Sequence, residues 1–446
     1  MSTPNKRREF IRNISIAGTT MLFYPALSSA SGFFKGSPNR KVVIAVMGTN
    51  SRGLYLAKAF AKLPDVEVGY ICDVDSSVLQ KTIAEIEKIS GKKPQGFTDL
   101  RKLLERKDFD GLVIAAPDHW HTPAAIMALQ AGKHVYVEKP CSHNPREGEL
   151  LVQASLKYNQ LVQMGSQRRT FANVKDMIAR LHRGDIGRVY FARGWYVNDR
   201  KTIGKGTKAE VPSKLDFDLW QGPAPRRDYR SNLVHYNWHW FWHWGTGEAL
   251  NNGTHELDVI RWGLQADYPT KVVSGGGRFH FSDDWETPDT QTITYNFPNN
   301  TGCTWEGRSC NSFNSEGSGR GVVFYGDKGT IHYPGGNSFT VYDPANKVIA
   351  AVKDNIVVDA GNTVSPTADL DGLHLLNFCE SIRGNEKINA PILEGHKSTL
   401  LPQLGNIAYR VGRTLQCDPS NGHILHDKEA MSLWSRQYEK GWEIKV

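Results

Sequence analysis

One lysine of the sequence occupies a position suited to proton transfer. Residues 132–140 read Gly-Lys-His-Val-Tyr-Val-Glu-Lys-Pro, which predicts a short strand that delivers Glu138 and Lys139 at its carboxyl end. Ligands of open α/β sheets bind beyond that end of the strands. Partial burial there lowers the pKa of an amine, so that Lys139 can move a proton to or from a substrate hydroxyl. An isolated lysine is more often a solvated surface charge, but the strand end and the following proline argue against that interpretation.

A glycine-containing turn, residues 48–53, follows the first predicted strand, residues 41–46. Glycines let the backbone approach a pyrophosphate, and the helix that follows favours the anion at its N-terminus. Asn50 replaces the central glycine of the G-x-G-x-x-G pattern and tolerates positive φ better than most residues. The alternative is that this turn occurs by chance and binds no phosphate. If the turn binds a dinucleotide, the residues that hold it are Gly48, Asn50, Ser51, Arg52 and Gly53.

An acidic residue, Asp73, ends the second predicted strand, residues 66–72. A carboxylate at this position hydrogen-bonds the adenosine ribose hydroxyls and repels a 2′-phosphate. The sequence therefore predicts NAD, rather than NADP, as the cofactor. The alternative is that Asp73 caps the helix beginning at Ser76, a role that Asp75 can also fill.

Apolar runs alternate with helical patterns along the first part of the chain. Strands are predicted at 41–46, 66–72, 111–116 and 134–137, and helices at 54–60, 76–89 and 123–131. Strands connected through helices form a parallel sheet with right-handed crossovers. We therefore expect an α/β fold with a doubly wound, Rossmann-type domain over residues 41–165.

Beyond about residue 165 the pattern changes to alternating apolar and polar residues. Such stretches at 189–196, 290–297 and 321–325 predict antiparallel strands, while 372–383 and 394–413 predict closing helices. We expect residues 166–446 to form a second, α+β domain with an open, mostly antiparallel sheet. An exposed face of such a sheet also favours a homo-oligomer.

Four segments together resemble the Gfo/Idh/MocA oxidoreductase family, which includes inositol dehydrogenase and glucose–fructose oxidoreductase. They are the turn at 48–53, Ala-Ala-Pro-Asp-His-Trp-His at 115–121, Glu-Lys-Pro at 138–140, and Gly-Thr-His-Glu-Leu-Asp at 253–258. The resemblance spans nearly the whole chain after residue 40. It implies that Lys139 is the catalytic lysine, that His255 reaches the reacting carbon, and that the open sheet forms the substrate site. It also implies cofactor contacts by Pro117, Trp120, His121, Glu138, Lys139 and Arg168.

One position departs from the family pattern. The family commonly has an aspartate four residues before the histidine, whereas this chain has Asn251. An amide can hydrogen-bond a sugar hydroxyl but cannot accept a proton as a base. We therefore assign proton transfer to Lys139 or His255, and substrate binding to Asn251 and Asp258. The alternative is that His255 is a core histidine of the helix, with an imidazole that is hydrogen-bonded by the protein itself.

Residues 215–244 are rich in tryptophan and histidine. Aromatic faces with nearby donors suit a pyranose ring, so Trp220 and Trp242 are predicted to contact the substrate. A core strand or an oligomer contact explains this tryptophan pattern equally well. The histidines lack the spacing of a known ligand set, so no metal is expected.

The function predicted from these residues is hydride transfer between a hydroxyl carbon of a sugar or cyclic polyol and NAD. One alternative is a glycoside hydrolase that works by oxidation, elimination, hydration and reduction on NAD. Some relatives resemble such hydrolases, although their strand-end sequence differs from the Glu138-Lys139-Pro140 present here. A second alternative is a sugar-binding protein without turnover. Asn251 supports this alternative, because an amide cannot act as a base.

The N-terminal residues resemble a twin-arginine export signal. Residues 6–11, Lys-Arg-Arg-Glu-Phe-Ile, precede a modest apolar stretch that is too short for a membrane anchor. We expect a signal at 1–30, a linker at 31–40 and a periplasmic location, the alternative being a disordered N-terminus. The twin-arginine route carries folded proteins, which favours a tightly held NAD.

Charge and cysteine content exclude other classes. The net charge is +8, and Lys6, Arg7, Arg8 and Arg12 against Glu9 contribute three of these charges. The remainder shows no basic run or helix stripe, so no nucleic-acid partner is expected. Six scattered cysteines indicate neither a zinc site nor a disulfide framework. Cys303 and Cys310 are near enough in sequence for a local bridge if the compartment is oxidising.

Overall fold

The computed structural model describes residues 40–354 and 368–446. The predicted signal, residues 1–30, and the linker up to residue 39 lie outside this range. All six cysteines are free thiols, so Cys303 and Cys310 are not bridged. Across the two described ranges, no helix has both the length and the apolar composition needed to cross a membrane.

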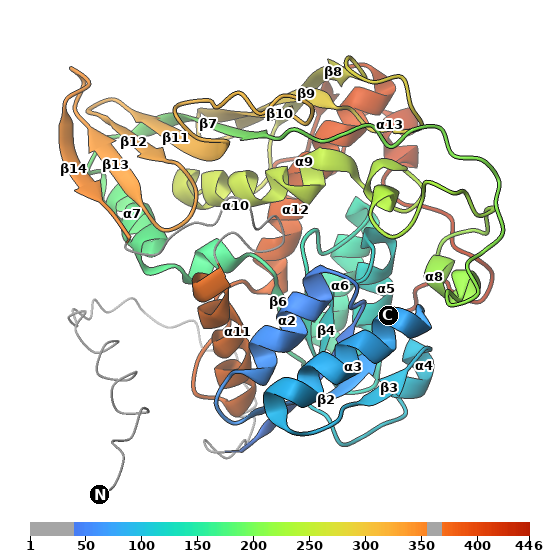
Figure 1. Ribbon diagram of the computed structural model, residues 1–446. Helices are drawn as coiled ribbons and strands as arrows, with labels where there is room; N and C mark the ends of the chain where they lie inside the picture. Colours follow the sequence, from blue (N-terminus) through green and yellow to red (C-terminus); the bar gives the residue numbers. More distant parts are fainter. Residues whose placement is uncertain (1–39, 355–367) are drawn as a thin grey trace, which may run out of the picture. The chain divides into compact units, whose positions relative to one another are not determined.

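A six-stranded parallel sheet forms the first domain, in the order β3-β2-β1-β4-β5-β6. Figure 1 labels four of its strands, β2, β3, β4 and β6. Its strands are β1 (Val42–Met47), β2 (Val66–Cys72), β3 (Gln95–Phe97), β4 (Gly111–Ile114), β5 (His134–Val137) and β6 (Val162–Met164). The strand order reverses between β1 and β4, which is where ligands bind in doubly wound sheets. The predicted Rossmann topology is thus confirmed.

Helices cover both faces of this sheet. Successive residues of each strand point to opposite faces, and the residues on both faces are apolar. Ile44 and Val46 pack with α2 (Arg52–Ala61), α3 (Ser76–Ser90) and the late helix α11 (Ala368–Arg383). Ala45 and Met47 belong to the core of the opposite face. The helices on that face are α4 (Leu100–Leu103), α5 (Asp118–Gln130) and α6 (Pro145–Tyr158).

Helix α5 begins at Asp118, five residues before the predicted start at Pro123. Proline is favoured in the first turn of a helix, which made Pro123 an attractive start. Pro117 is instead the N-cap, and Pro123 lies inside the helix. The segment expected along the cofactor therefore lies at a strand end and in a helical first turn.

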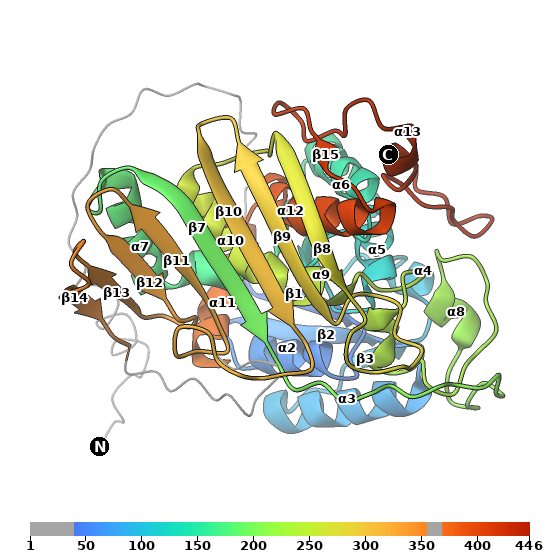
Figure 2. The ribbon, with the colours of Figure 1, turned by 90° about the horizontal axis from the view of Figure 1, so that it is seen from above.

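A nine-stranded sheet forms the second domain, in the order β14-β13-β12-β11-β7-β10-β9-β8-β15 (Figure 2). Strands β7 and β10 pair in parallel, and the other neighbouring pairs are antiparallel, as predicted. The bounds are β7 (Val189–Val197), β8 (Lys271–Gly277), β9 (Thr290–Phe297), β10 (Thr301–Arg308), β11 (Arg320–Gly326), β12 (Thr330–Tyr333), β13 (Phe339–Tyr342), β14 (Val348–Val352) and β15 (Leu415–Gln416).

One face of this sheet is packed against helices α7 (Ala172–Arg183), α10 (Gly253–Leu264) and α12 (Ile392–Val411). Along β9, Ile293 and Tyr295 are buried in that core, whereas Thr292 before them and Asn296 after them are exposed. Figure 2 shows the strands crossing above α10 and α12. Helix α12 also packs against α6 and β6, so it links the two domains.

A long segment, residues 198–246, connects β7 to the short helix α9 (Gly247–Asn251). We call it the strap. It contains α8 (Phe217–Gln221) and the 3₁₀ helix η2 (Asn237–Trp240), with its own aromatic core. Short helix α13 (Lys428–Ser432) precedes the C-terminal residues.

Candidate active site

Lys139 lies directly after β5 and reaches toward the second domain. Its side chain is half-buried, and its Nζ donates to the main-chain oxygen of Asn251 at 2.6 Å, with Asn251 Oδ1 at 3.3 Å. Burial lowers the pKa of Lys139, and the opposing effects of Glu138 and Asp118 do not restore it. The amine therefore has the environment expected of a proton-transfer group.

His255 lies in the first turn of α10, close in sequence to the Asn251 that contacts Lys139. Over residues 40–354 and 368–446, its imidazole has no hydrogen-bond partner, so it is not a core histidine satisfied by the protein. Burial, followed by the charges of Arg168 and Arg320, holds the pKa of His255 well below its usual value. The ring is neutral at physiological pH and is available to a ligand.

The turn after β1 has the shape that a dinucleotide pyrophosphate requires. Gly48 has φ +78°, and a Cβ there would lie 2.6 Å from the Ala116 backbone. A Cβ on Gly53 would lie 1.9 Å from Gly48 O. Ser51 precedes the ten-residue helix α2 without a side-chain cap, so the helix N-terminus can receive an anion. These residues fit the dinucleotide.

Asp73 stands at the end of β2, and a different residue caps the next helix. Asp75 accepts hydrogen bonds from Ser77 N and Val78 N, so it is the cap of α3. Asp73 accepts from Thr49 N at 2.6 Å and Asp75 N at 2.9 Å. Its burial raises its pKa. The hydrogen bonds fix the carboxylate beside the glycine turn, where a ribose hydroxyl can reach its remaining lone pairs.

Arg52 and Glu138 form an ion pair at the floor of the site. Arg52 Nε donates to Glu138 Oε1 at 2.8 Å, and its Nη1 donates to Asp371 Oδ2 at 3.0 Å. Gly165 leaves the room for this arrangement, because a Cβ there would lie 2.8 Å from Glu138 Oε2. The pair therefore joins α2 to the strand that carries Lys139. Asp371 was not predicted at this site, because it comes from α11, far away in the sequence.

Two further residues lie beside His255 and were not predicted. Glu256 is 1% exposed, and its Oε1 accepts from Arg168 Nη1 at 3.1 Å and from Arg320 Nε and Nη2 at 3.0 and 2.9 Å. Glu256 lies within the 253–258 segment and could have been noticed there. Arg320 comes from β11, and only the tertiary structure brings it to the site.

Comparisons with known proteins agree with this geometry. The NAD-binding Rossmann-fold domain of the Gfo/Idh/MocA oxidoreductases matches residues 42–166. The C-terminal alpha/beta domain of the same family matches residues 196–331 and 335–444, more than half of the chain. The chain belongs to the Gfo/Idh/MocA oxidoreductase family. Its N-terminal domain is accordingly an NAD-binding domain.

Solved structures share the fold of this Gfo/Idh/MocA chain. The WlbA dehydrogenase from Bordetella pertussis, in complex with NADH and UDP-GlcNAcA, has a TM-score of 0.63 at 19% identity. The match covers 85% of this chain and 99% of that one. Scyllo-inositol dehydrogenase from Lactobacillus casei, with NAD(H) and scyllo-inositol, has a TM-score of 0.61 at 18% identity, covering 84% and 99%.

Curated relatives align over shorter stretches. A glycosyl hydrolase family 109 protein from Stenotrophomonas maltophilia is 35% identical over 139 residues, which are 30% of this chain and 29% of that protein. One from Saccharopolyspora erythraea is 25% identical over 222 residues, 45% and 48% of the two chains. The chain thus spans less than half the length of each of these relatives.

Some residues predicted along the cofactor of the Gfo/Idh/MocA chain are engaged by the protein itself. His121 Nδ1 lies 2.6 Å from Pro140 O, and its Nε2 lies 2.7 Å from Ala116 O. Trp120 Nε1 donates to Trp220 O at 2.9 Å. The His121 side chain therefore links the segments that follow β4 and β5, and the Trp120 side chain is held by the strap. Arg168, also predicted at the cofactor, pairs with Glu256 beside His255.

The two tryptophans predicted to contact the substrate do not meet Lys139. Trp220 is 5% exposed and packs against Phe217 and Trp244 in the core of the strap. Trp242 lines a separate cavity of about 190 Å³ and stacks with Arg410 at 5.1 Å. Trp220 belongs to the short helix α8 and Trp242 follows the 3₁₀ helix η2, so the stretch is not the core strand considered as an alternative.

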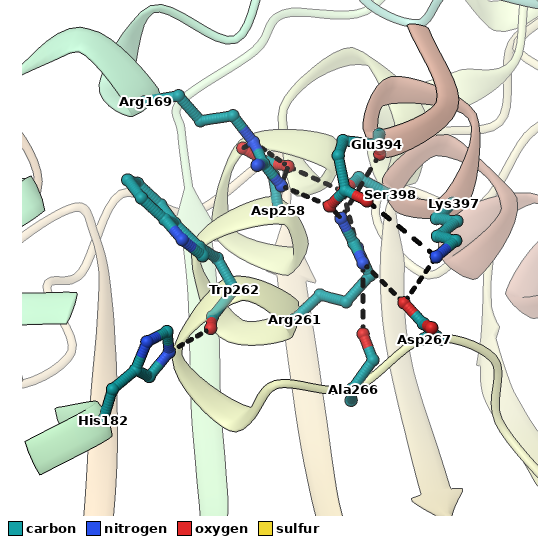
Figure 3. Close-up of polar contacts among 10 residues, drawn as sticks. All are labelled: Arg169, His182, Asp258, Arg261, Trp262, Ala266, Asp267, Glu394, Lys397 and Ser398. Atoms are coloured by element: carbon teal, nitrogen blue, oxygen red, sulfur yellow. Dashed lines mark hydrogen bonds and ion pairs between the residues drawn. The ribbon is translucent and has the colours of Figure 1, made fainter. Parts of the chain in front are cut away.

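Asp258 was predicted to bind substrate, but it is 1% exposed and committed to a buried ion pair (Figure 3). Arg169 Nε donates to both carboxylate oxygens at 3.0 Å, and Ser398 Oγ donates to Oδ1 at 2.6 Å. Burial opposes the charge, yet the Arg169 ion pair leaves the pKa of Asp258 below its usual value. Asp258 therefore fixes α10, and with it His255, against α12 and the 3₁₀ helix η1 (Gln167–Thr170) that follows β6.

The strap crosses the carboxyl ends of β2 and β4. Ser76 N donates to Lys214 O, and Asp216 N donates to Val74 O, both at 2.9 Å. Near β4, the carbonyl of Trp220 accepts from Trp120. These contacts hold the strap over the ends of the NAD-binding sheet.

Across the described ranges, no group of three or more histidine, cysteine, aspartate or glutamate side chains is arranged to hold a metal ion.

Proposed function

We propose that this chain transfers a hydride between a hydroxyl-bearing carbon of a pyranoside or cyclic polyol and a tightly held NAD. The observation that carries the proposal is the half-buried Lys139 at the end of β5, joined to the segment that presents His255. Lys139 stands at the end of β5, in the sheet whose first strand leads into the glycine turn, and His255 stands in the first turn of α10. The chemistry that they support is oxidation of a secondary alcohol.

Each residue has a distinct task in the reaction. Lys139 donates one N–H to Asn251 O, and in its neutral form it has a lone pair that accepts the proton of the substrate hydroxyl. Neutral His255 hydrogen-bonds the reacting oxygen and orients the carbon. Bound NAD supplies the acceptor of the hydride that leaves this carbon. The Asn251 side chain positions a neighbouring hydroxyl.

The strap supports the proposal that NAD remains bound through many turnovers. It is hydrogen-bonded near the ends of both β2 and β4, so release of the cofactor requires that these contacts break. We expect NAD to stay with the purified protein through extended dialysis. Loss of the cofactor on simple dialysis would contradict this part of the proposal.

Export and assembly belong to the same proposal. The paired arginines near the N-terminus support twin-arginine export to the periplasm, and the exposed strand residues of β9 support a homo-oligomer. Cell fractionation with Arg7 and Arg8 changed to lysine tests the first. Light scattering of the purified protein tests the second, and a monomer at all concentrations would exclude it.

The test of the central function uses the purified protein with its own NAD and a panel of free and glycosidic sugars. Reduction of the bound nicotinamide by one sugar, absent in Lys139→Ala, is expected. If no neutral or acidic pyranoside or polyol reduced the nicotinamide of the wild type, the result would favour a sugar-binding protein without turnover.

A glycoside hydrolase working through NAD is the second candidate, favoured by the alignments with glycosyl hydrolase family 109 proteins. In that cycle, oxidation of a ring hydroxyl acidifies the neighbouring C–H, the aglycone is eliminated, water adds, and the ketone is reduced again. Release of an aglycone without net reduction of the cofactor would identify this activity.

A further inference from the structure

Two arginines beside His255 share a single carboxylate. Arg168 belongs to the 3₁₀ helix η1 (Gln167–Thr170) and Arg320 to β11, and both donate to Oε1 of the buried Glu256. The aromatic ring of Tyr196 lies 5.0 Å from the Arg320 guanidinium. Tyr333 lies 5.9 Å from that of Arg168. The two guanidiniums are therefore held in place by packing as well as by charge.

Each guanidinium has donors left over. Arginine carries five N–H groups, and Arg168 gives only Nη1 to Glu256, while Arg320 gives Nε and Nη2. In the part of the chain that the structure describes, Arg168 Nε and Nη2 and Arg320 Nη1 have no hydrogen-bond partner. None of these three atoms is sealed from solvent. We call these three unpaired donors the fork. They belong to two guanidiniums that share one oxygen of Glu256, the residue next to His255.

Charge is unbalanced at this point. Two guanidiniums against one carboxylate leave one positive charge, which is shared by Arg168, 8% exposed, and Arg320, whose side chain is 23% exposed. Burial and then the Arg168 and Arg320 charges lower the pKa of His255, so the imidazole lies within reach of both guanidiniums. Arg52, in contrast, faces two carboxylates, those of Glu138 and Asp371.

We propose that the substrate carries a carboxylate, as in a uronic acid or its glycoside, and that this carboxylate binds between Arg168 and Arg320. The inference rests on the proposed function for the identity of the sugar ring. A carboxylate carries one negative charge, which matches the unbalanced charge, and its planar oxygens suit the fork geometry of arginine. A phosphate monoester carries nearly two charges at neutral pH and exceeds it.

The experiment measures binding rather than turnover, in the Lys139→Ala protein with NAD bound. Calorimetric titrations compare methyl glycosides in matched pairs, in which the hexoside and the hexuronide differ only at the exocyclic carbon. At least one hexuronide is expected to bind ten times or more tightly than its neutral partner, with a difference that shrinks at high salt.

Variants of the fork identify the carboxylate site. Arg320→Gln in the same background is expected to abolish the preference for the hexuronide, and Arg320→Lys to restore part of it. Arg193→Gln is the matched control, because Arg193 lies on the neighbouring strand β7 and pairs with the exposed Glu316. It should leave the preference intact. Circular dichroism and retained NAD verify that each variant is folded.

The outcomes separate the two proposals. Tighter binding of a hexuronide without nicotinamide reduction in the wild type would support the carboxylate site and contradict hydride transfer. Equal or weaker binding of every hexuronide, a preference that survives Arg320→Gln, or tighter binding of a sugar phosphate would overturn the carboxylate site. Failure of all pyranosides to bind would overturn it as well.

Discussion

The side-chain nitrogen of Lys139 lies 2.6 Å from the main-chain oxygen of Asn251, so the end of β5 meets the turn that leads into the His255 helix. The partner is a neutral carbonyl. The Asn251 side chain adds an amide oxygen at 3.3 Å, which carries no full negative charge. The pKa of Lys139 is therefore set mainly by burial, which lowers it.

Asn251→Asp is expected to raise the pKa of Lys139, because a nearby carboxylate stabilises the ammonium form. The neutral amine is the form that accepts the hydroxyl proton, so the acidic limb of the pH–rate profile for sugar oxidation moves to higher pH by about one pH unit. Asn251→Ala is the control, since it retains the main-chain oxygen and should leave the limb in place. An unchanged profile in Asn251→Asp would exclude Lys139 as the titrating base.

Asp258→Asn is expected to destabilise the protein by about 3–5 kcal/mol, because Arg169 would keep a buried charge without its partner. Urea unfolding of the purified variant measures this loss. Asp185→Asn is the control, since the Asp185 pair with Arg183 lies at the surface and contributes little. A loss no larger than that of the control would show that the pair is not needed to fix α10.

The same pair predicts a pH dependence of stability. The folded-state pKa of Asp258 is lowered, so its contribution is fully present above the unfolded value of about 4 and is lost as pH falls through the folded value. The wild type should therefore lose stability more steeply below pH 4 than Asp258→Asn. Parallel acid-unfolding curves would contradict this assignment.

Asp73→Ser is expected to weaken NAD binding by about tenfold and to improve binding of NADP, because the carboxylate both accepts from the ribose and repels the 2′-phosphate. Titration of cofactor-stripped protein with each dinucleotide checks this. Asp75→Ser is a close control, since Asp75 caps α3 and leaves the choice between cofactors unchanged. If Asp73→Ser and Asp75→Ser had the same preference for NAD over NADP, Asp73 would not be a cofactor-binding residue.

The sequence predicted those parts of the fold that depend on local pattern. Strand β9 was predicted with its observed bounds, because its apolar residues alternate strictly toward one core. The turn at Gly48 was found because only glycine fits its positive φ and close approach to Ala116. Both features depend on residues that are adjacent in the sequence.

Residues whose role depends on a distant partner could not be predicted in this way. Asp258 shares a motif with His255, but its role follows from Arg169 and Ser398, which lie far away in the sequence. Arg320 reached the site through the pairing of β11 with β7. Trp220 was misassigned because an aromatic pattern does not reveal whether rings face a ligand or one another.

The most direct test of hydride transfer uses a sugar substrate with deuterium on the reacting carbon. The protein with its bound oxidised NAD is mixed with the labelled sugar, denatured, and the released cofactor is analysed by mass spectrometry. We predict reduced cofactor that carries the deuterium in the wild type and unlabelled, oxidised cofactor in Lys139→Ala. Oxidised, unlabelled cofactor in the wild type, with a sugar known to bind, would contradict hydride transfer by this site.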